Sequence, residues 1–549
     1  MRPMRGPTAA ILLTLLTSCA AETDGARVAI NDPLALIDEI TPGTLRLLVL
    51  PASYTCDPTT GLLTPDPPDV PEGMIPEAVA DVTLEIAGGR AQREVSIPAG
   101  DHVVLVRGKG TDPVTMRPNV FIATACRAIS IGAGETQEAR LTLLRISGMG
   151  SCGDTILSPD EQCEDGNPTP GDGCSATCRT ETISVNTTTA GTQDRPQLAW
   201  ARGQRMLFTY DDLTSREILM RLLSPESQPI MTPSVLLNDA TLDAALAGMG
   251  PLSGQQQLTG AAVAPNGRLA VAFRDFGGGM SRVRAAFFTA DRAVEMVTPS
   301  LDDAPTSVTS APAIAFASDG SAILVYQSPA SATGFRGVVF AAGSSTPSAP
   351  FEVGTGASGL TEARAIGAGA GFAVAIAGGG DVRFQRFGTD GAPRDANAVA
   401  VLTDAAGTQD QPAIGAQSDG RFLVAWRDAM GDGAGTSIRA RVFGTDGAPA
   451  GEAFVVNSTT AGDQAAPSVA AAEDRYAVVF TSDASVRARV LAASGDPVPN
   501  REQPPTTADF VLGTGSAPSA AAGGSASQAR WAAAWNEGGD IRARWLPLP

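Results

Sequence analysis

The sequence predicts an all-β chain with three folded parts: an N-terminal β-sandwich, a small disulfide-rich module, and a C-terminal seven-bladed β-propeller closed by a strand from its own N-terminal side. Seven copies of one strand pattern follow each other in the C-terminal two-thirds. Apolar and polar residues alternate with period 2 in parts of the segment 41–147, which is typical of half-buried strands. Four cysteines lie close together between these regions.

The C-terminal repeats each contain four short strands separated by Gly-rich and Asp-Gly turns. The second strand of each copy ends on one large residue: Tyr210, Phe273, Tyr326, Ile376, Trp426, Phe480 or Trp535. The third strand recurs in step, for example as SIRARVF and DIRARWL. Four strands in a unit of roughly 50 residues are typical of propeller blades, so the copies predict seven blades between residues 182 and 549.

The two ends of this repeat array predict that it closes into a ring. The last copy stops after its third strand, and a segment like the missing fourth strand, Ile183–Asn186, precedes the first copy. Pairing of Ile183–Asn186 with Ile541–Leu546 would remove the open sheet edges at the junction. A linear array has no reason to divide one unit between its ends.

The N-terminus has the pattern of an export signal. Two arginines precede the apolar run Ala9–Leu16, which is too short to span a bilayer and predicts a signal peptide over residues 1–18. The sequence LTSC, which ends at Cys19, resembles the lipobox of bacterial lipoproteins. This resemblance implies lipid attachment at Cys19, a lipidated tether over 19–40 and, because Ala20 is not Asp, an outer-membrane location on the periplasmic or cell-surface face. The alternative is an ordinary signal peptide with an incidental cysteine.

Cysteine count and charge agree with an exported protein. Of seven cysteines, lipidation of one leaves six, an even number that can pair in an oxidising compartment. Loss of the two leader arginines leaves 37 basic residues (39 − 2) against 58 acidic ones, a net charge of −21. Such a charge argues against nucleic acid as a partner. It also argues against electrostatic adhesion to anionic lipid, so the lipid anchor is the predicted contact with the membrane.

The segment 41–147 predicts a β-sandwich of immunoglobulin or transthyretin-like type. Strands are expected at TLRLLVL, VTLEI, HVVLVRG and EARLTLLRI, and the proline-rich Pro58–Pro76 is expected to be a long loop. Cys56 and Cys126 are the only cysteines in this segment, so we expect them to form a disulfide.

The segment 151–181 predicts a module held together by two disulfides, because so short a stretch cannot bury a core. Its sequence CGDTILSPDEQCEDGNPTPGDGCSATC resembles the myxobacterial cysteine-rich repeat, whose pattern is roughly CGDG…GEECDDGN…GDGCSxxC. Cys152, Cys163, Cys174 and Cys178 allow three connectivities. A Cys₄ zinc site has the wrong spacing and is disfavoured in an oxidising compartment.

Calcium is the one metal that the residues of this module suggest. Asp165, Asn167 and Asp172 supply hard oxygen ligands, but Asx-rich turns have the same composition without an ion, and no full ligand series is present. No cofactor is expected otherwise.

The propeller repeats resemble tandem units of large bacterial exoproteins, of the type GDQ..PSVA..DGGFVVTW…G..I..QRY, best in TTAGDQAAPSVA and its neighbours. This resemblance implies a surface location more than an activity. The loops after the second strands and the connectors into the first strands must share one rim. The candidate ligand-binding residues on this acidic rim are Asp194, Asp211, Asp212, Arg274, Asp275, Asp410, Arg427, Asp428 and Asp463. The alternative is that they are capping and turn residues that satisfy strand ends.

Catalytic motifs are absent from the sequence. The only histidine, His102, lies in the sandwich segment, so no Ser-His-Asp or Cys-His set can form within the repeats. We therefore expect non-enzymatic recognition or adhesion of a protein or glycan through the acidic rim. Two alternatives stay open: an extracytoplasmic glycan hydrolase or lyase that uses rim carboxylates, and a structural spacer.

Overall fold

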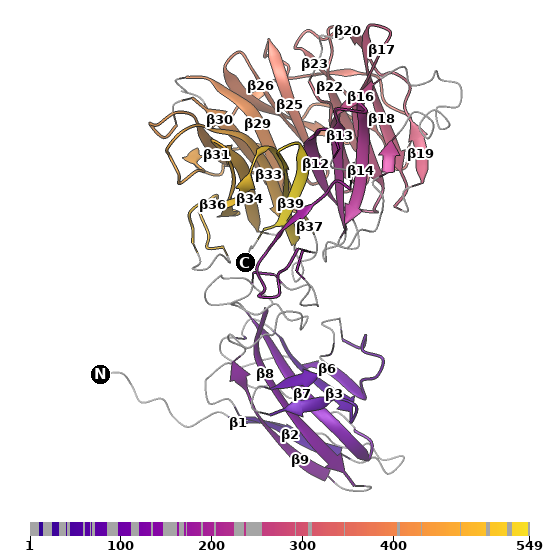
Figure 1. Cartoon of the computed structure of the whole chain (residues 1–549), viewed down its shortest axis with the longest axis vertical. Coiled ribbons are helices and arrows are strands. Elements are labelled where there is room, and N and C mark those ends of the chain that lie inside the picture. The colour runs from indigo at the N-terminus through magenta and orange to yellow at the C-terminus, as the bar shows by residue number, and fades with distance from the viewer. Residues whose placement is uncertain are drawn as a thin grey trace.

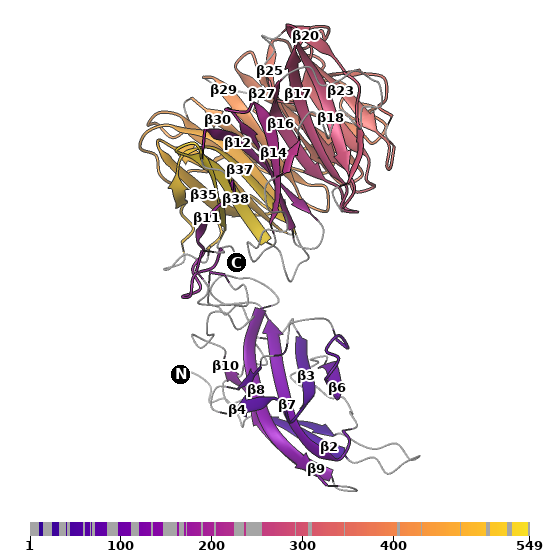
Figure 2. The same ribbon diagram turned by 45° about the vertical axis from the view of Figure 1, so that its right-hand side comes forward.

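The computed structural model contains only β-strands as regular elements among the residues that it describes. These residues are 10–14, 25–31, 40, 44–58, 61–65, 67, 72–84, 97–110, 120–132, 136–145, 162–163, 170–171, 173–187, 190–201, 205–223, 235–237, 255–290, 293–305, 310–344, 346–402, 407–429, 431–472, 474–500, 506–523 and 530–546. Over these ranges no helix is long and apolar enough to cross a membrane. The described part of the chain is thus all-β, as predicted, and Figures 1 and 2 show its strands in two lobes.

The first lobe contains two sheets and a hairpin. The three-stranded sheet has the order β1 (Ala10–Thr14), β2 (Gly25–Asn31), β9 (Thr136–Thr142). The five-stranded sheet has the order β10 (Leu144–Arg145), β8 (Val120–Ile131), β7 (Gly100–Gly110), β3 (Thr44–Pro51), β6 (Ala80–Leu84). Strands β4 (Thr55–Asp57) and β5 (Leu62–Thr64) pair with each other.

Both faces of the five-stranded sheet are covered, which explains the nearly continuous apolar runs of β3 and β7. On one face Leu47 and Val104 pack in a cluster with Leu141 of β9. On the other face Leu48 and Leu105 pack against Leu63 of β5. A disulfide between Cys56 of β4 and Cys126 of β8, the pair expected from the sequence, fixes the hairpin over this second face.

Two segments of this lobe differ from the sequence-based expectation. Part of the proline-rich Pro58–Pro76 is strand β5 and not loop, because the buried Leu63 pairs opposite Cys56 and completes the second core. Part of the expected tether is strand β2, which pairs in parallel with β9 over its whole length. The tether prediction therefore fails for Gly25–Asn31. Of the predicted signal peptide, Ala10–Thr14 forms β1 beside β2, and the other leader residues lie outside the described part.

The cysteine-rich module follows the first lobe. Cys163 and Cys174 form a disulfide with an S–S distance of 2.07 Å, and Cys178 is also disulfide-bonded. The Gln162 backbone N–H donates to the Cys178 carbonyl at 2.9 Å. The calcium candidates Asp165, Asn167 and Asp172 lie outside the described residues.

The second lobe contains seven consecutive antiparallel sheets, numbered here in chain order. The first is β12 (Gln193–Ala201), β13 (Arg205–Asp212), β14 (Glu217–Leu223), β15 (Val235–Leu237); the second is β16 (Gln255–Val263), β17 (Leu269–Gly277), β18 (Met280–Phe288), β19 (Val294–Val297), with β20 (Asp303–Pro305) also on β18; the third is β21 (Ala313–Phe316), β22 (Ala322–Gln327), β23 (Phe335–Phe340), β24 (Phe351–Val353). The fourth is β25 (Leu360–Gly367), β26 (Gly371–Gly378), β27 (Asp381–Gly388), β28 (Val399–Ala400); the fifth is β29 (Gln409–Ala416), β30 (Phe422–Asp428), β31 (Ser437–Phe443), β32 (Phe454–Val455). The sixth is β33 (Gln464–Ala472), β34 (Arg475–Ser482), β35 (Ser485–Ala492), β36 (Phe510–Thr514); the seventh is β37 (Ser516–Gly523), β38 (Arg530–Glu537), β39 (Asp540–Trp545), β11 (Thr182–Ser184).

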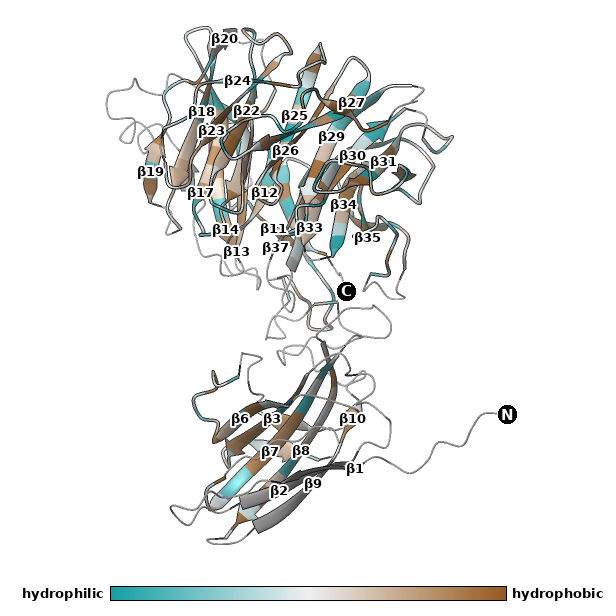
Figure 3. Ribbon diagram, turned by 180° about the vertical axis from the view of Figure 1, so that it is seen from behind, coloured by the Kyte–Doolittle hydropathy of each residue, from teal (hydrophilic) through white to brown (hydrophobic). Residues whose placement is uncertain are grey.

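The first strands of neighbouring sheets lie beside each other, and β37 lies beside β12, so the seven sheets form a closed ring. We call residues 182–546 the ring. Hydrophobic clusters fill the space between sheets; one contains Phe287 of the second sheet and Tyr326 of the third. The large residues that end the second strands are fully buried in such clusters, Trp426 and Trp535 among them. Hydrophobic segments lie within strands such as β17 and β22, whereas the strand ends and loops are more hydrophilic (Figure 3).

The seam between the seventh and first sheets has the same chemistry as a junction inside the array. Strand β11 pairs antiparallel with β39, and Ile183 lies opposite Ala543, as the sequence analysis expected. The Asn186 side chain accepts from the Ile541 backbone N–H at 2.8 Å and donates to Gln193 Oε1 at 3.1 Å. The Asn457 side chain makes the equivalent bonds inside the array, with the Ile438 N–H and with Gln464 Oε1.

An arginine on the third strand adds a second tie at several junctions. Arg441 donates to the Val401 carbonyl of the preceding sheet, and Arg489 donates to the Val456 carbonyl. Arg221 donates to the carbonyl of Val185, the residue that follows β11 at the seam. The segment after β11 therefore takes the place of a fourth strand toward both of its neighbours.

Candidate functional site

A cavity of about 610 Å³ lies at the centre of the ring. Residues from the first strand of all seven sheets line it, from Arg195, Glu362 and Gln411 at one end to Trp200, Phe316 and Gly367 at the other. Each of these strands is the edge strand of its sheet, so unpaired backbone groups border the cavity. Its volume falls within the range of protein sites for small ligands.

A β-bulge marks the polar end of the cavity in most sheets. The ladder between first and second strand skips two residues, for example between Asp194 and Gln197 and between Asp410 and Ala413. The first skipped residue has positive φ in four sheets: Arg195 (53°), Gln411 (50°), Ala466 (50°) and Ala517 (50°). A non-glycine residue in this region is strained, and a proline follows it each time. All four residues line the cavity.

The fourth sheet departs from this pattern. Strand β25 keeps regular pairing through Glu362, Ala363 and Arg364, with Arg364 opposite Ala375. Arg364 thus lies opposite the residue that precedes the large last residue of the second strand. The other six sheets have Gln197, Gly260, Ala313, Ala413, Ser468 and Ser519 at this position. All six are uncharged, so Arg364 is the only cation at this level of the ring.

The Arg364 guanidinium lies inside the cavity. Solvent in the cavity reaches the side chain, yet protein surrounds it; this burial lowers the pKa of Arg364, and the charge of Glu362 opposes the shift. The Nη1 atom of Arg364 donates to the Ala363 carbonyl at 2.9 Å. This bond uses one side of the planar guanidinium and leaves the other side toward the cavity. Glu362 and Arg364 are two residues apart on one strand and share a face.

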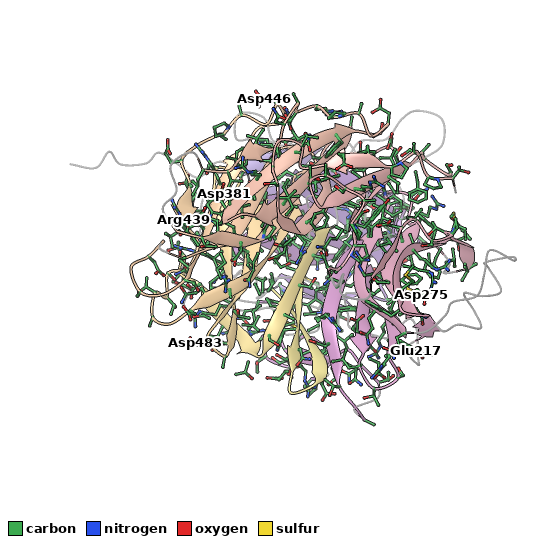
Figure 4. All side chains as sticks on the ribbon, turned by 90° about the horizontal axis from the view of Figure 1, so that it is seen from above. Glu217, Asp275, Asp381, Arg439, Asp446 and Asp483 are labelled. Carbon is green, nitrogen blue, oxygen red and sulfur yellow. A yellow bond between two sulfur atoms is a disulfide. The ribbon has the colours of Figure 1, made fainter. Side chains whose placement is uncertain are left out.

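Four of the rim residues predicted from the sequence are buried and not available to a ligand from solvent. Asp211, Arg274 and Asp275 are fully buried, and Asp428 is 2% exposed. Arg195 forms an ion pair with Asp211 at 2.9 Å, and Arg284 forms one with Asp275 at 3.5 Å. The Trp426 indole N–H donates to Asp428 at 3.3 Å. Figure 4 shows Asp275 and Glu217 on one side of the ring and Asp381, Arg439 and Asp483 on the other.

Arg274 connects two sheets. Its guanidinium donates to the Ser310 carbonyl at 2.8 Å, the Gln327 carbonyl at 3.0 Å and Ser281 Oγ at 3.1 Å. Burial lowers the pKa of Arg274 to about 10, and the charge of Asp302 opposes this shift. The side chain thus works as a clamp between the second and third sheets.

The remaining rim residues are partly exposed and have partners in turns or ion pairs. Arg427 pairs with Asp410 through two hydrogen bonds, and the bond to Asp410 raises the pKa of Arg427. Asp212 accepts from the Thr214 N–H at 2.8 Å. Asp463 accepts from the Thr436 N–H at 3.0 Å, and Asp194 accepts from Asn536 Nδ2 at 3.2 Å. Capping and turn roles therefore account for the contacts of these side chains.

Sequence reasoning missed Glu362, Arg364 and Thr259 as site residues. Thr259 lines the cavity, is 3% exposed, and its Oγ1 has no hydrogen-bond partner within the described ranges. The signal was available in the repeat itself: TEARAIG has Arg364 at a position where the other first strands, such as QDQPAIGA and SAPSAAAG, have an uncharged residue.

The groups that titrate unusually do not form an acid–base pair at the cavity. The carboxyl groups with a clearly shifted pKa, those of Glu77, Glu352, Asp419 and Asp509, are all shifted downward. His102 lies on β7 in the first lobe, where its Nε2 is 2.9 Å from the Pro98 carbonyl oxygen. No cluster of three metal-ligating side chains occurs among the described residues.

Comparison with known proteins gives one family match. Residues 149–179 match a family described as Domain of unknown function (DUF4215), which coincides with the cysteine-rich segment predicted from the sequence. This match covers a small part of the chain. No curated protein matches the sequence.

Solved structures that match this chain have low identity and low structural agreement with it. A protein of unknown function from Dyadobacter fermentans DSM 18053 has 12% identity and a TM-score of 0.36; the match covers 55% of this chain and 93% of that one. The Hadza microbial sialidase Hz136 has 11% identity and a TM-score of 0.37, with 92% and 89% covered. Prolyl oligopeptidase B from Galerina marginata has 10% identity and a TM-score of 0.39, with 62% and 46% covered, so the match spans less than half of that enzyme.

Proposed function

We propose that this chain is a lipid-anchored outer-membrane protein whose ring is a seven-bladed β-propeller that recognises a ligand without catalysis, through the cavity at its centre. The observation that carries the proposal is the cavity of about 610 Å³ to which all seven first strands contribute. The proposed contact surface is therefore the polar end of the cavity and not the outer acidic rim. On that rim Asp211, Arg274, Asp275 and Asp428 are buried.

Seven sheets in chain order, each antiparallel and each with its first strand at the cavity, support the propeller assignment. The proposed division of the chain is a signal peptide over 1–18, a lipidated segment over 19–40, a sandwich over 41–147, the cysteine-rich module over 151–181 and the propeller over 182–549. The lipobox-like sequence at Cys19 supports the anchor, and the resemblance of the repeats to exoprotein units supports a periplasmic or cell-surface location. In the mature chain, cleavage before Cys19 removes β1 and leaves β2 at the sheet edge.

The main alternative is a glycan hydrolase or lyase with two carboxylates. Such an enzyme needs a general acid with a raised pKa beside a second carboxylate. Glu362 is the one carboxylate among the described residues that line the cavity, and the shifted carboxyl groups of the described chain all move the other way. Binding without turnover therefore fits the cavity better.

The test is a glycan and peptide array probed with the full chain in detergent, with calcium and with chelator, followed by incubation of each captured compound with the protein. We expect capture without chemical change. Turnover of a captured glycan would refute the non-enzymatic assignment, and capture that survives closure of the cavity end by an Ala522→Trp substitution would refute the cavity as the site. Ala522 is a partly buried residue at the apolar end of the channel.

A further inference from the structure

The seven first strands provide an internal comparison that needs no related sequence. At the level of Arg364 the ring carries five small residues and Gln197. Just before this level β12, β16, β29, β33 and β37 each have a bulge, whose second residue is Thr259 in β16 and a proline in the other four (Pro196, Pro412, Pro467 and Pro518). Only β25 places a charged residue, Arg364, at this level. A structural repeat gains nothing from a cation on the cavity wall that its six equivalents lack.

The Arg364 side chain has the properties of an anion-binding group. A guanidinium offers five N–H donors in a planar fork that matches a carboxylate. Inside the ring, Arg364 donates to the Ala363 carbonyl, and burial opposes its charge. A charge held in such a place is stabilised by an anion that replaces the lost hydration.

One further group at the same end of the cavity completes the pattern. Glu362 shares the face of β25 with Arg364, and its Cα is about 7 Å away, the spacing of residues i and i+2 on a strand. Both residues line the cavity. A cation and an acceptor side by side on the cavity wall suit a molecule with a carboxylate and a neighbouring donor.

We propose that the polar end of the central cavity binds a small carboxylate that carries an adjacent hydrogen-bond donor, either a hydroxyl or an ammonium group. The carboxylate lies on the Arg364 fork, and the donor faces Glu362. This inference rests on the proposed function, because it names the ligand class of the same cavity. Glu362 also repels polyanions, so the site selects single carboxylates over multiply charged ones.

The test is titration calorimetry of the full chain in detergent with galacturonate as hydroxy-carboxylate, alanine as amino-carboxylate, acetate as bare carboxylate and galactose as neutral sugar. We expect galacturonate or alanine to bind at least tenfold more tightly than acetate and galactose. Arg364→Gln reproduces the residue that β12 has at this level, so the ring accommodates it, and it should weaken that binding at least tenfold. Arg364→Lys keeps the charge but loses the fork and should weaken it less.

Control variants separate the site from general effects. Arg421→Gln removes an arginine from an exposed hairpin, where it pairs with Asp419, and should leave every titration unchanged. Glu362→Gln distinguishes an ammonium donor from a hydroxyl donor on the ligand. It should weaken the binding of alanine at least tenfold but that of galacturonate little, because an amide oxygen still accepts a hydrogen bond from a hydroxyl.

The inference is overturned if neither galacturonate nor alanine binds, if galactose binds equally well, or if Arg364→Gln leaves carboxylate binding intact. The proposed function survives those results when an array compound still binds in a manner blocked by Ala522→Trp. The proposed function fails separately if the Ala522→Trp variant captures the array compound as well as the parent chain does.

Discussion

Closure of the ring through Asn186 gives the sharpest test of the architecture. Asn186→Ala removes a bond from the Ile541 N–H at 2.8 Å, one to Gln193 Oε1 at 3.1 Å and a charge-assisted one to Asp540 Oδ1 at 2.8 Å. At about 1 kcal/mol for each neutral bond and about 1.5 kcal/mol or more for the charged one, the loss is about 3–4 kcal/mol.

The assay is urea unfolding followed by the fluorescence of the buried tryptophans, combined with hydrogen exchange of the Ile541 amide. Asn457→Ala is the matched control, since it removes the equivalent bonds to Ile438 and Gln464 within the array. Both variants should lose a similar free energy, but only Asn186→Ala should speed exchange along β39 and β11. If Asn186→Ala stays within 0.5 kcal/mol of the parent while Asn457→Ala loses the expected amount, β11 does not close the ring.

Three other predictions follow from buried groups. Burial opposes ionisation of Asp509, but hydrogen bonds from Thr459, Ser458 and Arg487 outweigh this effect and lower its pKa. Asp509→Asn should therefore lower the free energy of unfolding by about 3 kcal/mol at pH 7. When unfolding is measured against pH, this difference from the parent should shrink as the pH falls below about 4 and through the lowered pKa of Asp509. A deficit that is constant down to pH 2 would contradict this. Arg274→Lys should cost about 2–4 kcal/mol, because an ammonium cannot reach all three acceptors of the fork, and an unchanged unfolding midpoint would contradict the clamp. With Cys163 joined to Cys174 and Cys178 oxidised, non-reducing peptide mapping should recover a Cys152–Cys178 peptide, and its absence would show that Cys178 pairs elsewhere.

The order of the strands, the β11–β39 pairing and the Cys56–Cys126 bridge followed from local pattern and counting. Apolar strands that end on residues such as Trp426 repeat in the sequence because each sheet packs against neighbours of the same kind, and a fourth strand missing from one end must come from the other. A segment with two cysteines offers one intramodular pair. Such inferences need only periodicity and edge pairing, both of which are written into the chain.

Whether a charged strand end faces solvent was decided by tertiary structure alone. Asp211 and Asp275 look like exposed loop carboxylates in the sequence, but Arg195 and Arg284, from other strands, neutralise them and let them be buried. Conversely, Arg364 has the sequence context of an arginine in an ordinary strand, and only the closure of the ring places it on the wall of a central cavity. The physical reason is that burial of a charge depends on counter-charges and walls supplied by distant segments, which no local pattern contains.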